Sequence, residues 1–544
     1  MDITIFVLYH LTKTIEMKYF LILLLILIVA CESDQKKSEF DFTTRFEQSE
    51  GHETSTYEEV IDYYYNLADT YPEINIEAIG STDSGEPLHL ITLDPQSGFD
   101  FNVIRKNKLV LLINNGIHPG EPDGIDATML LFRDIVQGKI DIPNHIVLTT
   151  IPIYNVGGSL NRNSNSRANQ NGPKEYGFRG NARNYDLNRD FIKCDTENAR
   201  TFAKIFHRVK PDVFIDNHVS NGADYQYTLT HLFTQHNKLG GALGDYLDNH
   251  LITELERHLT LKDWDITPYV NVFNRKPELG FSQFMDSPRY STGYTTLWNV
   301  LGMMIETHML KHYKQRVEGT YDIMKSMIEI MEEDVSTIRS LRKEAHQNMI
   351  TTSYYPLNWK IDSTRHTTIS FMGYEGQVIK SEITGNDRLK FDRSKPFTKD
   401  VKYYNFYIPA DSIKIPKAYI IPQGWLNIVE LLKLNQVEVT TITKDTLMQV
   451  QSYRIENYNT YTSPYEGHYP HYNTTVKASS TAMKCRAGDY LIKTDQKAIR
   501  YLLETLEPQA PDSFFNWNYF DTILQQKEGF SPYVWEDKAK ALLK

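Results

Sequence analysis

Apolar and polar positions alternate along the first two thirds of the chain in blocks that predict strands followed by helices. Residues 109–113 form a continuous aliphatic run, which predicts a strand over 109–114 that is central and covered on both faces. An amphipathic stretch opens at Pro122 and closes at Gly138, which predicts a helix over 122–137. Further strands are predicted at 74–79, 88–93, 146–154, 213–217 and 302–306, and further helices at 57–71, 196–208 and 309–347. This alternation predicts an α/β fold, a mixed, largely parallel sheet with helices on both faces.

Beyond residue 349 the pattern changes to alternating Thr, Tyr, Val and Ile, interrupted by Gly and Pro. This texture predicts a β-rich accessory domain, with helical pieces near 426–434 and 496–506. The tyrosine-rich segment 458–472 is predicted to be an aromatic surface loop packed on its neighbour. A carbohydrate or peptide contact is the alternative for this loop.

The N-terminus has the pattern of a processing signal. Lys18 precedes an apolar run over 19–30 that is too short to span a bilayer comfortably. Residues 28–31 resemble the bacterial lipobox, which implies cleavage before Cys31 and lipid attachment to it. The chain is then expected to be secreted across the inner membrane and held by a lipid anchor in the cell envelope, in the periplasm or at the cell surface. A plain secretory peptide or an N-terminal membrane anchor is the alternative.

Polar residues 32–54 predict a flexible tether between this signal and the first domain. The predicted organisation has four parts: a signal and lipoprotein segment over 1–31, the tether over 32–54, a catalytic domain over 55–347 and the accessory domain over 348–544.

Composition narrows the classes of function. A net charge of −11 argues against a nucleic-acid binder, and nothing in the sequence resembles the basic stripe that binds phosphates, so no nucleic-acid partner is expected. Beyond Cys31 the only thiols are Cys194 and Cys485, which make neither a disulfide framework nor a cysteine-metal motif. A metal site on this chain would therefore use histidine and carboxylate ligands.

Candidate ligands stand at the ends of two predicted strands. His118 and Glu121 follow the aliphatic run 109–113 with the spacing of a two-ligand site, and His218 ends the run that begins at Val213. Asp216 stands two residues before His218, where it could orient that imidazole. A catalytic zinc needs three protein ligands and an open position for water. Taken alone, a His-x-x-Glu pair or a strand-end histidine is more often structural.

The remaining motifs follow in a specific order along the chain. A segment ending in Asp-Leu-Asn-Arg at Arg189 lies between the two ligand segments, and Glu306 ends a further apolar strand. Over about residues 56–345 the chain thereby resembles the zinc metallocarboxypeptidase family of the carboxypeptidase A type. Carboxypeptidase A is itself a standard His₂Glu zinc enzyme. The resemblance implies one Zn²⁺ per chain, held by His118, Glu121 and His218.

The resemblance also implies roles for residues around the metal. Asn188 and Arg189 would bind the substrate's terminal carboxylate, Arg179 would polarise the scissile carbonyl, and Glu306 would act as general base and acid. Tyr290 would close over the bound substrate. The alternatives are Arg162, Arg167 and Arg183 for Arg179, Tyr294 for Tyr290, a salt-bridged structural role for Glu306, and a structural or orienting role for His308.

The activity so implied is zinc-dependent hydrolysis of a C-terminal peptide bond, with a substrate that carries a free C-terminal carboxylate. Ungapped counting from Tyr290 places Leu297 near the side-chain pocket, which predicts an apolar or aromatic preference. One alternative is a zinc-dependent deacylase or amidase acting on N-acyl amino acids or muropeptides. The other is an inactive lipoprotein that binds a peptide or glycan.

Overall fold

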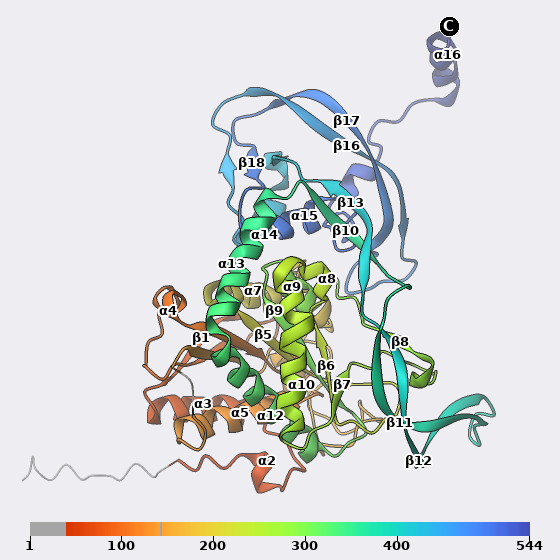
Figure 1. Cartoon of the computed structure of the whole chain (residues 1–544). Coiled ribbons are helices and arrows are strands. Elements are labelled where there is room, and N and C mark those ends of the chain that lie inside the picture. The colour runs from red at the N-terminus through yellow and green to blue at the C-terminus, as the bar shows by residue number, and fades with distance from the viewer. Residues whose placement is uncertain (1–39, 142–143) are drawn as a thin grey trace, which may run out of the picture. The chain divides into compact units, whose positions relative to one another are not determined.

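A mixed sheet carries the candidate residues in the computed structural model, which describes residues 40–141 and 144–544 (Figure 1). Within these residues the sheet has eight strands in the order β1-β2-β4-β3-β5-β9-β6-β7. Its strands are β1 (Ile74–Ser81), β2 (Pro87–Leu93), β3 (Leu109–Asn114), β4 (Ile146–Ile151), β5 (Val213–Ser220), β6 (Leu229–Phe233), β7 (Ile266–Pro268) and β9 (Leu301–His308). The central strands β4, β3, β5 and β9 run parallel, whereas β2 and β6 pair antiparallel with them. The predicted α/β architecture is confirmed.

Helices cover both faces of this sheet because its central strands are apolar on both sides. Every residue of β3 and β4 is buried. On one face lie α3 (Tyr57–Thr70), α5 (Asp123–Val136) and α12 (Tyr313–Glu333), and on the other lie α7 (Glu197–Val209) and α11 (Ser291–Thr296) (Figure 1). The shorter helices before residue 300 are α2 (Arg45–Gln48), α4 (Phe101–Asn107), α6 (Val156–Leu160), α8 (His236–Leu239), α9 (Gly241–Tyr246) and α10 (Ile252–Thr260). Single helical turns lie at η1 (Leu187–Arg189), η2 (Leu247–Leu251) and η3 (Pro277–Leu279).

The single helix predicted over 309–347 is wrong. The structure has two helices, α12 and α13 (Val335–Thr351), separated at Asp334. The Asp334 carboxylate accepts a hydrogen bond from the Tyr246 hydroxyl at 2.7 Å and lies 2.8 Å from His250 Nε2. These contacts come from a distant part of the chain and hold Asp334 outside helical geometry, so a local pattern could not predict the break.

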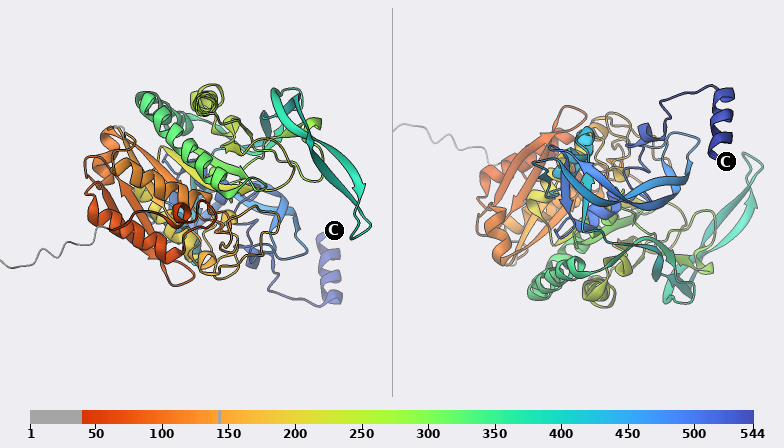
Figure 2. Two further views of the ribbon diagram at one scale, coloured as in Figure 1. Left: turned by 90° about the horizontal axis from the view of Figure 1, so that it is seen from below. Right: turned by 90° about the horizontal axis from the view of Figure 1, so that it is seen from above.

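The region after α13 is β-rich, as predicted. Two long hairpins dominate it, β11 (Thr367–Lys380) with β12 (Asp387–Tyr404), and β16 (Thr446–Thr460) with β17 (His471–Cys485). In both views of Figure 2 the β11–β12 hairpin projects to the side of the sheet. The other elements are β10 (Tyr354–Ile361), β13 (Tyr407–Lys414), β14 (Ala418–Ile421), β15 (Thr440–Thr441), β18 (Tyr490–Lys493), η4 (Gln423–Trp425), α14 (Leu426–Leu434), α15 (Ile499–Leu506), η5 (Asp521–Leu524) and α16 (Pro532–Leu542).

Residues 44–544 form one compact unit. Within this unit, β12 pairs in parallel with β8 (Phe281–Ser282). A strand of the C-terminal region therefore lies beside a strand of the preceding region. The four-part division of the chain stays a prediction. The apolar run 19–30 and Cys31 lie outside the described residues. Across the part of the chain that is described, no helix has the length and apolar character needed to cross a membrane.

Candidate metal centre

His118, Glu121 and His218 converge at the carboxyl ends of β3 and β5. One ligand atom from each lies within 4.8 Å of the others, and all three residues are buried. His118 Nδ1 is 3.3 Å from Glu121 Oε1, and His218 Nδ1 is 3.2 Å from Glu121 Oε2. The cluster predicted from two separate strand ends therefore forms in the structure.

The backbone explains why these three side chains meet. β3 and β5 are parallel neighbours with Asn114 opposite Asp216, so the residues that follow them emerge at the same edge of the sheet. A tight turn after β3, closed by a 2.8 Å bond from Glu121 N–H to His118 O, places both side chains in the same site. The N–H of Val219 donates to Glu121 Oε2 at 3.0 Å and holds this carboxylate against β5.

A carboxylate holds the outer nitrogen of each imidazole. Asp186 Oδ1 lies 2.9 Å from His118 Nε2, and Asp216 Oδ2 lies 3.0 Å from His218 Nε2. Each Nε2 then donates a proton to its carboxylate, which directs both Nδ1 atoms at the centre. The contact between Asp216 and His218 is the one expected of the predicted orienting role. The sequence analysis did not identify Asp186 as a partner of His118, because the two residues are far apart in the chain.

The charges around Glu121 suit a cation. Burial alone would raise the pKa of Glu121, but Arg167 and His118 hold it well below its usual range. The pKa of His218 lies well above its usual value, because Asp216 and Glu121 outweigh the effect of burial. Two imidazoles and an ionised carboxylate, each fixed from behind, fit the donor set of a divalent metal such as zinc.

Glu306 stands beside this centre on β9. Its backbone is paired with His218 in the parallel register of β5 and β9, and with Thr230 on β6. Burial raises the pKa of Glu306 to about 7, with Glu121 and Asp216 adding to the rise and His218 and Arg179 opposing it. A carboxyl group whose pKa lies near neutrality can both take up and release a proton.

Two of the four candidate arginines reach the centre. Arg167 Nη2 lies 3.0 Å and Arg179 Nη1 lies 3.7 Å from Glu121 Oε1. Arg162 instead donates to backbone carbonyls of Thr54, Ser55 and Glu175, and Arg183 pairs with Asp83 at 3.4 Å. The structure thus brings together Arg179 and its alternative Arg167, and places the other two elsewhere.

Asn188, Arg189 and Tyr290 form a second group next to the metal centre. The Arg189 guanidinium lies over the Tyr290 ring, 4.5 Å from its centroid. The N–H of Ser291 approaches Asn188 Oδ1 at 3.4 Å. Asp186 links this group to the centre, because its Oδ2 lies 2.8 Å from Arg179 Nη2 and 3.8 Å from Arg189 Nη2.

The alternatives Tyr294 and His308 occupy other surroundings. Tyr294 is fully buried and its hydroxyl donates to Asn435 Oδ1 at 2.7 Å. His308 Nε2 lies 3.4 Å from Asp224 Oδ1. Leu297 is only 1% exposed. The pKa of Tyr269 is raised by burial and by Glu306.

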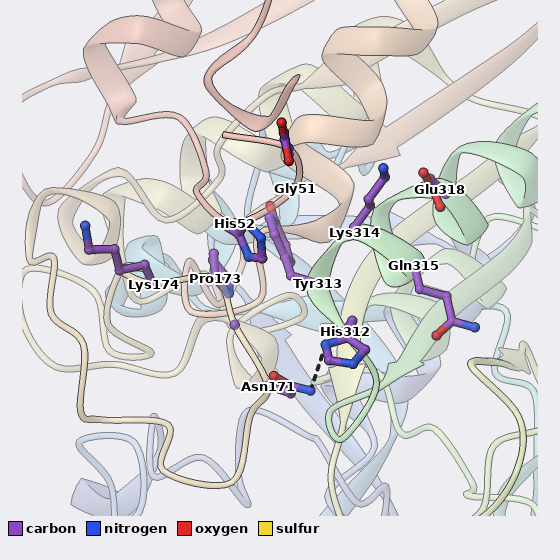
Figure 3. Close-up of a pocket in the computed structure, with 12 residues that line it drawn as sticks. Gly51, His52, Asn171, Pro173, Lys174, His312, Tyr313, Lys314, Gln315 and Glu318 are labelled. Atoms are coloured by element: carbon purple, nitrogen blue, oxygen red, sulfur yellow. Dashed lines mark hydrogen bonds between the residues drawn. The ribbon is translucent and has the colours of Figure 1, made fainter. Parts of the chain in front are cut away.

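A different set of residues lines a pocket of about 770 Å³ (Figure 3). Residues 50–52, the loop 171–174 and the start of α12 surround it. Figure 3 shows His52, Lys174 and His312 among its side chains, with Asn171 bonded to His312. None of the metal-centre residues is in this lining, so the pocket is a separate feature of the surface.

A buried His-Glu-His cluster thus stands at the strand ends of a mixed α/β sheet. No family model matches the sequence. Over 446 residues the chain is 22% identical to Carboxypeptidase 2 of Trichophyton tonsurans and to that of Trichophyton equinum, covering 75% of this chain and 73% of each relative. Among solved structures, carboxypeptidase A from Helicoverpa armigera is 14% identical, covering 59% of this chain and 81% of that chain with a TM-score of 0.39. The predicted resemblance to metallocarboxypeptidases is confirmed. It supports the assignment of this chain to the metallopeptidases.

Proposed function

We propose that the chain is a zinc-dependent carboxypeptidase that removes the last residue from peptides with a free terminal carboxylate. The convergence of His118, Glu121 and His218 beside Glu306 is the observation that supports it most directly. Arg189 and Tyr290, on the adjoining segment, supply a site for the end of the peptide. The names of the similar fungal proteins agree with this proposal.

The two histidines and Glu121 would hold the zinc. Zinc in such a site is a Lewis acid that lowers the pKa of water from 15.7 to about 7. Glu306 takes a proton from the attacking water as the oxygen adds to the carbonyl carbon. The same carboxyl group then delivers that proton to the leaving nitrogen as the C–N bond breaks, so no covalent enzyme intermediate is needed.

Arg179 would stabilise the oxyanion that forms when water adds to the carbonyl. Removing one such donor typically lowers kcat by about 10²–10³. Arg167 lies closer to Glu121 and is the competing donor. Comparing Arg179→Lys with Arg167→Lys distinguishes them, because the larger fall in kcat marks the residue that faces the carbonyl.

Arg189 would bind the terminal carboxylate through two parallel hydrogen bonds, a geometry that lysine cannot reproduce. Asn188 would donate its amide to the same group, and Tyr290, already stacked with Arg189, would cover the bound end of the peptide. This recognition restricts cleavage to a bond beside a free carboxylate.

The test compares blocked dipeptides that have free or amidated C-termini, using the full chain purified in detergent with its zinc content measured. We expect cleavage of the free-carboxylate peptide only, lost on chelation and in Glu306→Gln. Equal cleavage of the amidated peptide contradicts the role of Arg189. Cleavage of N-acyl amino acids without cleavage of dipeptides assigns the chain to the deacylases instead.

We also propose that the protein is anchored in the cell envelope through lipid on Cys31. The lipobox-like residues 28–31 support this location. The expected result of Cys31→Ala is release of the protein from the membrane fraction. Unchanged membrane association in that variant rejects the anchor.

A further inference from the structure

The tip of the β16–β17 hairpin lies against the segment that carries Asn188 and Arg189. Figure 1 shows this hairpin as the long curved pair of strands near the top right. Tyr465 and His468 exchange backbone hydrogen bonds of 2.8 and 3.1 Å, which makes residues 465–468 a two-residue turn. Oε2 of Glu466, within this turn, accepts a 2.8 Å hydrogen bond from Asp186 N–H. Asp186 is the residue that also contacts His118 and Arg179.

Several further contacts hold the tip in this place. His468 Nε2 lies 2.7 Å from Asp195 Oδ2, and the Tyr465 ring stacks on Trp517 with centroids 6.1 Å apart. The Arg289 guanidinium lies 5.6 Å from the centroid of the Tyr465 ring. Arg289 directly precedes Tyr290 in the chain. The tip therefore borders Arg189 from two sides, at Asp186 and at the 289–290 segment.

The turn has an unusual residue at its first central position. Glu466 and Gly467 have φ of 49° and 77°, as a type I′ turn requires, and Asn, Asp or Gly normally fill the first of these places. Gly467 permits close contact, since a Cβ there would overlap the Tyr185 hydroxyl. A glutamate held in the left-handed region points to a function of its side chain beyond turn formation.

Most charged side chains around the hairpin tip are paired with each other, but Glu466 and Arg189 are not fully paired. Lys193 is fully buried and bonded to Asp190 and Asp195 at 2.7 and 2.5 Å. Arg289 is paired with Asp512 at 2.7 Å. Within residues 40–141 and 144–544, Glu466 forms no ion pair.

Among the described residues, the ion pairing of Arg189 is limited to a 3.8 Å contact with Asp186, which is itself bonded to Arg179. The Arg189 Nη1 also donates to the Asn188 carbonyl at 2.7 Å. The pKa of Glu466 is raised by burial and by Asp186, while Lys193 and Arg189 oppose this rise. One cation and one anion are thus left to face a ligand on this side of the centre.

We propose that Glu466 is a specificity-determining residue that selects lysine or arginine at the C-terminal position of the substrate. This inference rests on the proposed carboxypeptidase function. The terminal carboxylate binds Arg189 while the cationic side chain binds the free Oε1 of Glu466. This proposed preference for lysine or arginine replaces the apolar preference predicted from Leu297. The sequence analysis considered only the segment after Tyr290, whereas Glu466 comes from a distant hairpin.

The test compares kcat/KM for blocked dipeptides ending in Arg and in Phe, using the zinc-loaded full chain. Glu466→Gln keeps an oxygen that accepts from Asp186 N–H but removes the charge. We expect kcat/KM for the Arg peptide to fall by about tenfold to a hundredfold, as for loss of a charge-assisted hydrogen bond, with the Phe peptide little changed. Glu456→Gln, exposed on β16 of the same hairpin, is the matched control and leaves both values unchanged.

If Glu466 is purely structural, Glu466→Gln lowers kcat/KM for the Arg and Phe peptides by the same factor. An Arg-to-Phe ratio of kcat/KM that stays at the wild-type value therefore overturns the proposal. In Glu466→Lys the preference moves to a peptide ending in Glu, a gain that loss of a brace cannot produce. Calorimetric titration with L-arginine and L-phenylalanine tests the same selection without turnover. Absence of cleavage by the wild-type chain contradicts the proposed function, whereas equal affinity for the two amino acids contradicts the role of Glu466.

Discussion

Asp186 connects three parts of the candidate site at the scale of a single residue. Its Oδ1 contacts His118 Nε2, its Oδ2 pairs with Arg179, and its backbone N–H donates to Glu466. These contacts, with His118 and Arg179 among the causes, hold the pKa of this carboxyl well below its usual value despite its burial. One residue therefore links a candidate metal ligand, an arginine of the site and the hairpin tip.

We expect Asp186→Asn to weaken zinc binding by about 10–100-fold, the usual effect of losing a carboxylate behind a histidine ligand. The amide can still contact Nε2 but does not stabilise the positive charge that builds on the imidazole. Competition with a chromophoric chelator measures the affinity. Asp62→Asn, on the exposed side of α3, is the control. Equal affinities in the two variants would contradict the orienting role of Asp186.

The residues that sequence reasoning found are those with local signals. His118 and His218 each follow a short run of apolar residues within five positions, and Glu306 ends another such run, so pattern and chemistry lie close together. Glu466 has no such signal, because its neighbourhood is created by a hairpin from a distant part of the chain. Arg167 and Arg179 lie in an irregular loop, where spacing does not reveal which side chain points inward.

At the scale of elements, the same distinction separates correct and wrong predictions. The strand predicted over 109–114 is β3, and the helix predicted over 122–137 is α5 within one residue at each end. Both elements are encoded by periodic burial. The break between α12 and α13 depends instead on contacts that Tyr246 and His250 make with Asp334, which are tertiary contacts.

Helices α7 and α11 and the end of α14 are joined by a buried polar cluster that makes their packing sensitive to acid. His207 Nε2 lies 3.1 Å from the Tyr294 hydroxyl and 3.4 Å from Asn435 Oδ1. Burial lowers the pKa of His207 to about 4. The unfolded chain, with a pKa near 6.5, binds a proton that the folded chain excludes.

The contribution of His207 to the free energy of unfolding is therefore fully present above about pH 6.5 and is lost as the pH falls toward 4. This contribution is at most about 3 kcal/mol. We expect His207→Gln to flatten the pH dependence of the unfolding midpoint between pH 6.5 and 4. Denaturation followed by tryptophan fluorescence across this range measures it. His145→Gln, an exposed histidine, is the control and keeps the wild-type slope. Parallel slopes in all three proteins would show that His207 does not titrate in this window.

At the scale of the whole unit of residues 44–544, the C-terminal region shares its core with the sheet region. One apolar cluster combines Tyr225, Val270 and Phe281 with Phe371 and Val401. Lys238 of α8 and Glu504 of α15 form a buried ion pair at 2.9 Å. Side chains from both regions are therefore buried against each other.

The Arg500 side chain provides the sharpest test of this coupling. It is 8% exposed and donates to the carbonyls of Lys238, Leu239 and Thr296 at 3.3, 2.8 and 3.2 Å. In Arg500→Met these acceptors lose their partner, at a cost of about 1–3 kcal/mol for each that stays unpaired. Because the bonds cross between regions, we expect one calorimetric transition that shifts as a whole to lower temperature. Two transitions, with only one displaced, would mean that residues 348–544 unfold as an independent domain.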